Sequence, residues 1–248
     1  MIVLFTDFGS RGPYVGQLHA VLMREAPGVG IVDLLHDAPA CDPRASAYLL
    51  AAFAPEFPTG SVFLAVVDPG VGGARGAAIV EADGRWFVGP ENGLFELLVR
   101  RACRPCRCWQ ITWQPPRLSA SFHGRDLFAP VAARLALGHP PAGRPRPIAE
   151  MRRREWPDDL AEVVYIDGFG NAMTGIRAAS LSEHAILIVN GHAVCRTQTF
   201  SAVEPGSAFW YENANGLAEL AVNAGRAESA LGLRVGTRVS VGSDGVLR

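Results

Sequence analysis

Short apolar runs alternate with helix-forming segments through the first half of the chain, and this alternation limits the folds that it can adopt. Apolar and β-branched runs predict strands over 1–5, 30–37 and 61–68, followed by a hairpin around Asp83-Gly84 that joins 76–83 to 85–90. Segments with helical apolar spacing predict helices over 14–26, 43–57, 92–102 and 125–138. Buried strands that alternate with helices are typical of a mostly parallel sheet covered on both faces. We therefore predict an N-terminal three-layer α/β/α domain of the α/β class.

Three of these strands end in polar side chains that can meet at one edge of the sheet. Asp7 follows the first strand, the pair His36-Asp37 closes the second, and Asp68 ends the third. Open α/β sheets bind ligands along the edge formed by the carboxyl ends of their parallel strands. These side chains are therefore candidates for a ligand site.

The character of the sequence changes near residue 138, where proline and arginine replace the apolar periodicity. We interpret 146–158 as an interdomain linker between an N-terminal domain at 1–145 and a C-terminal domain at 159–248. Short β-type runs divided by glycine and asparagine turns fill the second domain. Such spacing predicts a small β-barrel or sandwich.

Composition excludes several classes of function. The 248 residues carry a net charge of −1, so no surface for nucleic acid is predicted. All 23 basic residues are arginines, which excludes a lysine Schiff base, a Walker lysine and a pyridoxal phosphate anchor. The odd number of 5 cysteines suits a reducing compartment, and the first apolar run stops at Asp7, which is too short for a signal peptide or membrane span. We expect a cytoplasmic protein that binds no membrane.

The stretch AVVDPGVGGARGAA (65–78) places Asp68 and Arg75 at the two ends of a turn rich in glycine. A dinucleotide-binding fingerprint is not favoured, because Arg75 occupies the sixth position of the glycine pattern and a strand-like run follows it. Two interpretations remain open. The turn either has no role beyond reversing the chain, or it aims a carboxylate and a guanidinium into a site.

Two groups of residues could bind a metal, but their spacing favours neither. The cluster CRPCRC (103–108) lacks the second Cys or His pair that a structural zinc site needs. The other group consists of Asp7, His36, Asp37, Asp42 and His123. Helix capping and turn formation explain Asp37 and Asp42 without a metal. No metal site is predicted.

Two further motifs combine residue types that can bind or activate a ligand. His123 stands at a predicted strand-to-helix junction, where it is either a packed histidine or a catalytic one. The stretch IDGFGNAMTG (166–175) places Asp167, Phe169 and Asn171 on one turn. An acid, an aromatic ring and an amide could bind an amine, stack on a base and pair with its edge, or they could belong to a plain hairpin turn.

Six motifs together resemble one family in their order and spacing: TDFG (6–9), HDAPACD (36–42), VVDPGVGGAR (66–75), GPENGL (89–94), FHGRDLFAP (122–130) and IDGFGNAMTG (166–175). The chain resembles the S-adenosyl-L-methionine (SAM) hydroxide adenosyltransferases, whose relatives include the SAM-dependent chlorinases and fluorinases. The resemblance implies an N-terminal α/β/α domain, a C-terminal β-barrel and a homotrimer. It also implies that the ligand lies between the N-terminal domain of one subunit and the C-terminal domain of its neighbour.

The resemblance implies a reaction in which SAM and water give adenosine and L-methionine, with SAM as the substrate and no cofactor. The family's catalytic Asp, Arg and His fall on Asp68, Arg75 and His123. Sulfonium is a good leaving group, but water is a poor nucleophile with a pKa of about 15.7. A cation and a neutral imidazole can orient one water and favour hydroxide character. The alternatives are a SAM-dependent chlorinase and a non-catalytic SAM or adenosine sensor. The halide-using relatives carry tyrosine in place of Asp68, which favours hydrolysis.

Substrate contacts follow from the resemblance, position by position. Asp7 corresponds to the acceptor of the ribose hydroxyls, and Asp167 to the partner of the methionine ammonium. The adenine-binding positions fall on Phe169, Phe200 and Asn171, and further contacts near adenine and the methionine carboxylate fall on Asn213, Asn215 and Ala224. The chain departs from the family pattern at His19, Cys41 and Gly175, where a lysine, an aromatic residue and an asparagine are usual. These departures concern fine substrate contacts.

Overall fold

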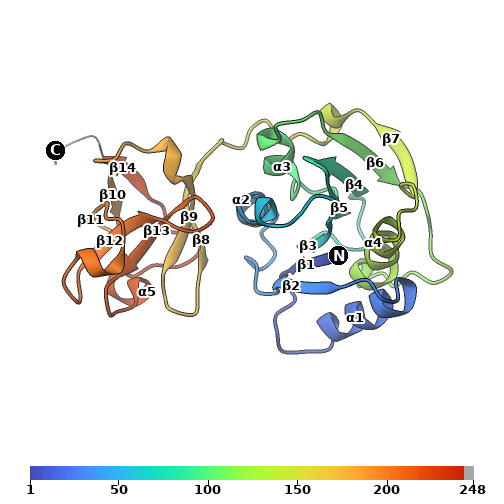
Figure 1. Ribbon diagram of the computed structural model, residues 1–248, viewed down its shortest axis with the longest axis horizontal. Helices are drawn as coiled ribbons and strands as arrows, with labels where there is room; N and C mark the ends of the chain where they lie inside the picture. Colours follow the sequence, from blue (N-terminus) through green and yellow to red (C-terminus); the bar gives the residue numbers. More distant parts are fainter. Residues whose placement is uncertain (243–248) are drawn as a thin grey trace. The chain divides into compact units, whose positions relative to one another are not determined.

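The structure, a computed structural model, describes residues 1–242 and divides the chain into two compact units (Figure 1). The first unit comprises residues 1–154, and the second begins at Glu155. The first unit is built on a seven-stranded sheet of order β2-β1-β3-β5-β4-β6-β7. Its strands are β1 (Ile2–Thr6), β2 (Ile31–Leu35), β3 (Val62–Val66), β4 (Ala77–Ala82), β5 (Arg85–Pro90), β6 (Arg107–Ile111) and β7 (Gly143–Arg146).

Four neighbouring strands of this sheet are parallel, as the alternation of strands and helices predicts. β1 pairs in parallel with β2 and β3, and β3 pairs in parallel with β5. In this register Thr6 lies beside Val66, so the chain leaves β1 and β3 at the same edge of the sheet. Asp7 and Asp68 therefore follow adjacent strand ends, which is the arrangement that the sequence predicts.

Helices pack against the sheet because each carries an apolar face. They are α1 (Tyr14–Glu25), α2 (Pro43–Phe53), α3 (Glu96–Arg101) and α4 (Ala129–Ala136), together with short 3-10 helices at Ala54–Glu56 and Ile148–Met151. α1 contacts α4, and α2 contacts α3, so that two pairs of helices enclose the sheet in the three-layer α/β/α arrangement (Figure 1). The helix predicted over 125–138 begins instead as a π-helical turn at Gly124–Phe128.

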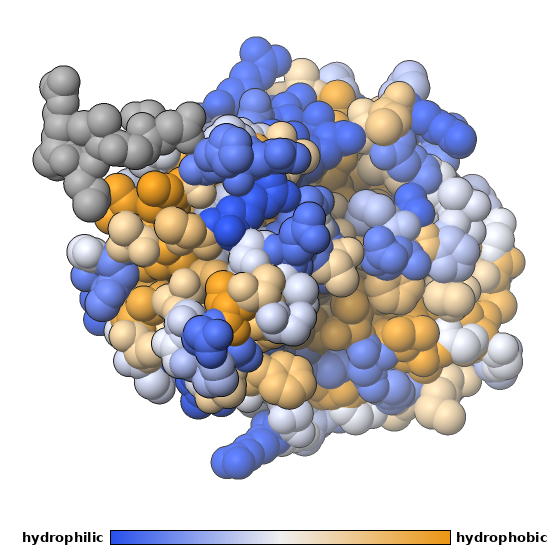
Figure 2. Space-filling view, turned by 60° about the vertical axis from the view of Figure 1, so that its left-hand side comes forward, coloured by the Kyte–Doolittle hydropathy of each residue, from blue (hydrophilic) through white to orange (hydrophobic). Residues whose placement is uncertain are grey.

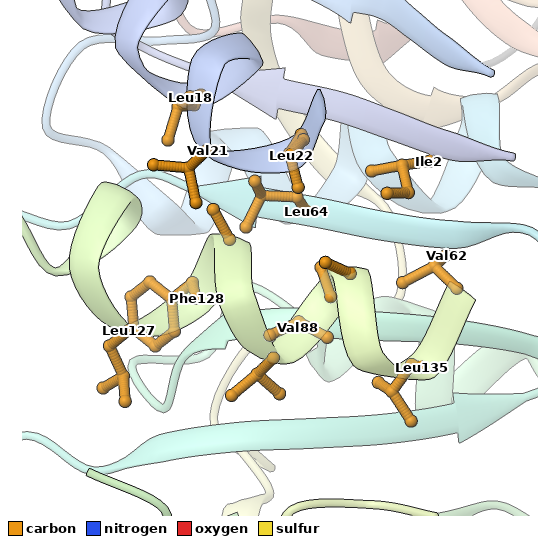
Figure 3. Close-up of a cluster of buried hydrophobic side chains, with 14 of the residues drawn as sticks. Ile2, Leu18, Val21, Leu22, Val62, Leu64, Val88, Leu127, Phe128 and Leu135 are labelled. Carbon is orange, nitrogen blue, oxygen red and sulfur yellow. The ribbon is translucent and has the colours of Figure 1, made fainter. Parts of the chain in front are cut away.

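The core on one face of the sheet shows the alternation that strands impose. Leu4 and Leu64 of the central strands belong to one buried cluster with Leu18 and Leu22 of α1 and with Phe128. Figure 3 shows Leu64 between the side of α1 that carries Leu18 and Leu22 and the helix that follows Phe128. All five side chains are fully buried. Burying each large apolar side chain contributes about 1.5–3 kcal/mol of transfer free energy, so this cluster supports the strand ends that carry Asp7 and Asp68.

The sequence prediction misses two strands. β6 includes part of the cysteine cluster, and β7 lies within the proline- and arginine-rich stretch that begins near residue 138. Both strands pair in antiparallel fashion at the edge of the sheet, β6 with β4 and β7 with β6. Their backbone groups find partners on the preceding strand, although their own sequences show no clear strand periodicity.

A buried carboxylate fixes the end of the first unit. Glu96 is 3% exposed. It accepts hydrogen bonds from the Arg100 side chain at 2.7 Å, from Arg152 Nε at 3.0 Å and from the backbone N–H of Arg153 at 2.7 Å. A buried charge is tolerated when it is paired and hydrogen-bonded in this way. The chain is thus held against α3 just before Glu155, where the second unit begins.

The second unit contains two antiparallel sheets, of order β12-β13-β9-β8 and β11-β10-β14. Their strands are β8 (Leu160–Ile166), β9 (Ala172–Arg177), β10 (Ile186–Val189), β11 (His192–Cys195), β12 (Ala208–Glu212), β13 (Leu217–Val222) and β14 (Ser240–Gly242). Helix α5 (Ala227–Ala230) and 3-10 turns at Ala178–Ser180 and Phe200–Ala202 complete it. The β character is confirmed. Isolated bridges join the two sheets, Glu162 of β8 with Arg238 and Arg196 with Trp210 of β12.

Polar and apolar residues are interspersed over the face seen in Figure 2, with no continuous apolar belt across it. Among residues 1–242, no helix has both the length and the apolar character needed to cross a membrane.

Capping by Asp42 explains where α2 begins, and it can be tested by substitution. Asp42 Oδ1 accepts the backbone N–H of Ala45 at 2.9 Å, and Pro43 occupies the first turn. We expect Asp42→Ala to lower the free energy of unfolding by about 1 kcal/mol, because one helix N–H loses its acceptor. Urea denaturation measures this change. Asp42→Ser, which keeps an acceptor oxygen, should retain most of the stability; an equal loss in both variants would contradict a capping role.

Candidate active site

The turn between β3 and β4 brings Asp68 and Arg75 together. Gly73 N–H donates to the carbonyl of Gly70 at 3.0 Å and tightens the turn. Gly72 has a φ of +75°, and a Cβ atom there would lie 2.4 Å from the carbonyl oxygen of Ala120. Only glycine combines this backbone conformation with such a close approach. The turn between β3 and β4 therefore packs directly against the loop that contains Ala120 and leads to His123.

Asp68 and Arg75 form a fork-shaped ion pair. Arg75 Nε donates to both Asp68 oxygens, at 2.9 and 3.0 Å, and Nη2 donates to Oδ2 as well. The two side chains are 5% and 12% exposed. The guanidinium lies over the ring of Phe128, 5.2 Å from its centre. Asp68 holds the edge of the planar guanidinium and Phe128 packs against its face, so the guanidinium has little freedom to move. It can therefore orient a third side chain through its remaining N–H groups.

His123 is that third group. Arg75 Nη2 lies 2.9 Å from His123 Nδ1. Because a guanidinium can only donate, Nδ1 must accept, which makes the imidazole neutral with its proton on Nε2. Burial lowers the pKa of His123 below its usual value, and the charge of Arg75 lowers that pKa further, against the opposing effects of Asp68 and Asp126. Asp68, Arg75 and His123 are thus joined in one hydrogen-bonded chain.

The loop before His123 is fixed by its own contacts. Asp126 Oδ2 accepts the backbone N–H of Ser119 at 2.8 Å, and Oδ1 accepts Arg125 Nε at 2.6 Å. Arg125 also donates to Gln17 of α1 at 2.8 Å. Arg125 and Asp126 therefore pair locally, and Arg125 connects this loop to α1.

A cavity of about 510 Å³ opens above these residues, at the carboxyl edge of the sheet. Asp7, Asp68 and His123 line it, and an aromatic cluster of Phe8, Tyr14 and Phe122 lines it as well. Asp7 Oδ2 accepts the backbone N–H of Cys41 at 2.9 Å. Burial raises the pKa of Asp7, and the nearby charge of Asp68 raises that pKa as well. The cavity thus combines carboxylates, a neutral imidazole and apolar walls.

A second cavity, of about 670 Å³, lies within the second unit. Its lining includes five residues that the resemblance assigns to the substrate: Asp167, Phe169, Asn171, Phe200 and Ala224. Asp167 Oδ1 accepts the backbone N–H groups of Phe169 and Asn171, both at 2.9 Å. This bonding leaves the Phe169 ring 80% exposed. The turn that Asp167 stabilises thus leaves the Phe169 ring exposed to solvent, where the ring is suited to stack on a flat ligand.

The two asparagines assigned to the substrate lie elsewhere. Neither Asn213 nor Asn215 lines the second cavity. Asn213 Oδ1 accepts the backbone N–H groups of Asn215 and Leu217, and its Nδ2 donates to Glu219 at 2.7 Å. The side chain of Asn213 therefore stabilises the turn between β12 and β13 in this structure.

Sequence reasoning misses three polar residues around the second cavity. Tyr211 and Arg226 line it, and the Tyr211 hydroxyl donates to Glu219 at 2.8 Å. Glu219 is 2% exposed, and burial raises its pKa. A glutamate in the middle of the apolar run LAELAV was the signal that could have indicated a buried polar contact.

The three residues that depart from the family pattern lie close to neighbouring segments. His19 Nε2 lies 2.8 Å from Asp33 Oδ1, which His36 also contacts at 3.0 Å. Gly175 lies against β8, where a Cβ atom would approach the Leu160 backbone oxygen to 2.9 Å. Cys41 adopts a φ of +56° and contributes its backbone N–H to Asp7.

The residues considered as metal ligands are engaged in other contacts. His36 Nδ1 lies 2.8 Å from the hydroxyl of Thr6, and Asp42 caps α2. In the part of the chain that the structure describes, no group of three His, Cys, Asp or Glu side chains is arranged to hold a metal ion.

Comparison with known protein families identifies the chain's relatives. Residues 2–143 match the SAM hydroxide adenosyltransferase N-terminal domain, and residues 161–240 match the C-terminal domain of the same family. The chain belongs to the SAM hydroxide adenosyltransferase family. The resemblance drawn from the six motifs is thereby confirmed.

Three individual proteins match over nearly the full chain. An (R)-S-adenosyl-L-methionine hydrolase of Thermus thermophilus is 43% identical, over 96% of this chain and 98% of its own. A protein of the same name from Salinispora tropica is 37% identical, over 95% of both. The crystal structure of an uncharacterized conserved protein from Thermotoga maritima superimposes with a TM-score of 0.87 and 28% identity, over 97% of this chain and 99% of that one.

The protonation state of His123 leads to a prediction. Its pKa is lowered in the folded chain, so we expect the imidazole to titrate below its usual value of 6.5. Folding therefore disfavours the protonated form, and the stability associated with neutral His123 is lost as the pH falls below 6.5. Nitrogen-15 NMR of the histidine rings should show a proton on Nε2 and none on Nδ1 at neutral pH. A proton on Nδ1 at neutral pH would exclude the bond from Arg75, and a pKa above 6.5 would contradict the effect of burial on this ring.

Proposed function

We propose that this protein hydrolyses SAM to adenosine and L-methionine. The observation that carries the proposal is the chain of contacts Asp68–Arg75–His123 at the wall of a cavity that also contains Asp7. These three residues occupy the positions that the family resemblance assigns to catalysis. The names of the full-length relatives from Thermus thermophilus and Salinispora tropica support the same substrate and reaction.

The reaction needs one water aligned with the bond between sulfur and the ribose C5′ carbon. The water oxygen forms a bond to C5′, the C5′–S bond breaks, and its electron pair returns to sulfur as methionine leaves. One proton of the water passes to the bulk solvent, which balances the charge lost from the sulfonium. Holding the two reactants in line contributes at best about 7–11 kcal/mol to lowering the barrier.

The side chains have different parts in this step. The Nε2–H of neutral His123 is a donor that can hold the water oxygen in place, since Nδ1 is occupied by Arg75. The guanidinium of Arg75 stabilises hydroxide character in the attacking water. Asp68 keeps Arg75 in the required orientation through the fork of hydrogen bonds. The apolar walls formed by Phe8 and Phe122 limit the number of competing waters.

The same proposal assigns the substrate contacts. Asp7 accepts hydrogen bonds from the ribose hydroxyls, as a carboxylate can do for a diol. Phe169 and Phe200 stack on adenine, Asn171 pairs with its edge, and the backbone at Ala224 contributes there. Asp167 faces the methionine ammonium. The lining of the second cavity by these residues supports this assignment.

We also propose that the protein acts as a homotrimer, with each substrate bound by the first unit of one subunit and the second unit of its neighbour. The support is the family resemblance, together with the division of the candidate residues between two separate units. Asp7, Asp68 and His123 belong to the first unit, and the aromatic residues that would hold adenine belong to the second.

Hydrolysis is tested by incubating SAM with the protein in water enriched in oxygen-18. We expect adenosine to carry the label on its 5′ oxygen and methionine to carry none, because water attacks carbon. Repeating the assay in high chloride should give no 5′-chloro-5′-deoxyadenosine. A chlorinated product would indicate a halogenase, and ligand binding without any product would indicate a sensor.

The residue roles predict a specific pattern of loss in this assay. Arg75→Ala and His123→Ala should each lower kcat by about 10²-fold or more, because these groups act on the water. Binding of SAM, measured by calorimetry, should change much less. Arg134→Ala and His139→Ala alter exposed residues of the same types and serve as controls. Equal losses in turnover and affinity would contradict the assignment.

The stacking role of Phe200 predicts a loss of affinity. Its ring meets Phe209 edge-on at 5.0 Å and Tyr211 at 5.4 Å, so it is held in a defined orientation. Phe200→Ala should weaken adenosine binding by about 1–3 kcal/mol, the value of one base–aromatic stack. Calorimetry with adenosine measures this loss. Phe57→Ala removes a ring that packs on Phe63 in the first unit and should leave the affinity unchanged. Unchanged affinity in Phe200→Ala would remove this ring from the site.

A further inference from the structure

The motif GPENGL (89–94) contributes no side chain to the lining of either cavity, yet it contacts the turn that carries Asp68 and Arg75. Asn92 Nδ2 donates to the carbonyl of Val67 at 2.8 Å. The backbone N–H of Glu91 donates to the carbonyl of Gly76 at 3.0 Å. Val67 immediately precedes Asp68, and Gly76 immediately follows Arg75. Two consecutive residues of the motif therefore hold both ends of the catalytic turn.

The side chain of Asn92 uses both halves of its amide. Its Nδ2 reaches Val67, which is fully buried, and its Oδ1 accepts the backbone N–H of Leu94 at 3.3 Å. The first bond crosses to the end of β3, while the second closes a local turn. These bonds can be separated experimentally, because aspartate keeps an acceptor for Leu94 but loses the donor to Val67.

The opposite end of the turn is held just as closely. A Cβ atom on Gly76 would lie 2.3 Å from Glu91 Oε2, and that carboxylate oxygen accepts Arg146 Nη1 at 2.8 Å. Arg75 Nη1 donates to the Gly76 carbonyl at 3.2 Å, the same oxygen that accepts the Glu91 N–H. Because this end is fixed through backbone atoms and Arg146, a shift at the Val67 end would change the distance between Asp68 and Arg75.

We propose that Asn92 is a positioning residue for the hydrolysis, an inference that rests on the proposed function. Its Nδ2–H group holds the carbonyl of Val67, the residue between the end of β3 and Asp68. Asp68 orients Arg75, and Arg75 orients His123, so the water is positioned through this series of contacts. Asn92 itself touches no reacting atom. A misplacement of about 1 Å in such a series can cost about 10²-fold in rate.

The test compares Asn92→Asp and Asn92→Ala with a matched control in the second unit. Asn190 Nδ2 donates to the carbonyls of Leu231 and Gly232, both at 3.0 Å, and Asn190 lines neither cavity. Asn190→Asp therefore makes the same chemical change away from the catalytic turn. We expect both Asn92 variants to lower kcat by about 10–100-fold with adenosine affinity retained within about twofold, and Asn190→Asp to retain its kcat. Nitrogen-15 NMR should show an altered His123 ring in the Asn92 variants alone.

Three results would overturn the proposal. The first is a kcat in Asn92→Asp that matches the wild-type protein. The second is a loss in Asn92→Asp but none in Asn92→Ala, which would assign the effect to the introduced charge. The third is a parallel loss of adenosine affinity, which would indicate general damage to the site. A wild-type protein that forms no adenosine would instead refute the proposed function, and the His123 signals would still report whether Asn92 positions the turn.

Discussion

The hydrogen bonds of the Arg75 guanidinium with Asp68 and His123 set the geometry of the candidate site. Arg75 donates to the Asp68 carboxylate through its fork and to His123 Nδ1 through Nη2. Because a guanidinium carries donors alone, this contact fixes the imidazole as a neutral ring with its proton on Nε2. The ring therefore presents a donor and not a base. Without Arg75, His123 could adopt either tautomer, and its pKa would lose one of the influences that lower it.

This geometry depends on backbone contacts more than on the three side chains. Glycine at position 72 lets the turn approach Ala120, and glycine at position 76 lets it approach Glu91. Each close approach brings together segments that are distant in sequence, so the turn is enclosed from two sides. A site built on such contacts is rigid before any ligand arrives, which is the condition for a water to be held in one place.

The sequence predicts local structure and strand ends well, because these depend on neighbouring residues. The hairpin at Asp83-Gly84 has the positive φ values, +47° and +76°, that a tight turn requires, and Asp7 and Asp68 follow adjacent parallel strands as expected.

The contact of Arg75 with His123 could not be predicted, since it depends on the packing of two loops 48 positions apart in the chain. β7 was missed because an edge strand depends on its partner. The hydrogen bonds of Asn213 to Leu217 and Glu219 were not predicted, because they depend on how the turn between β12 and β13 folds.

Charge balance connects the site to the substrate that we propose. The charges of Asp68 and Arg75 cancel, Arg125 at the same wall is paired with Asp126, and His123 is neutral, so Asp7 is the charged lining residue whose charge these pairs leave unbalanced. Burial and the charge of Asp68 raise the pKa of Asp7, so both disfavour its ionised form. A sulfonium cation bound nearby would favour that ionised form and lower the pKa again. Adenosine carries no charge and would lose this attraction after the C5′–S bond breaks. The site would therefore bind its cationic substrate more strongly than its nucleoside product.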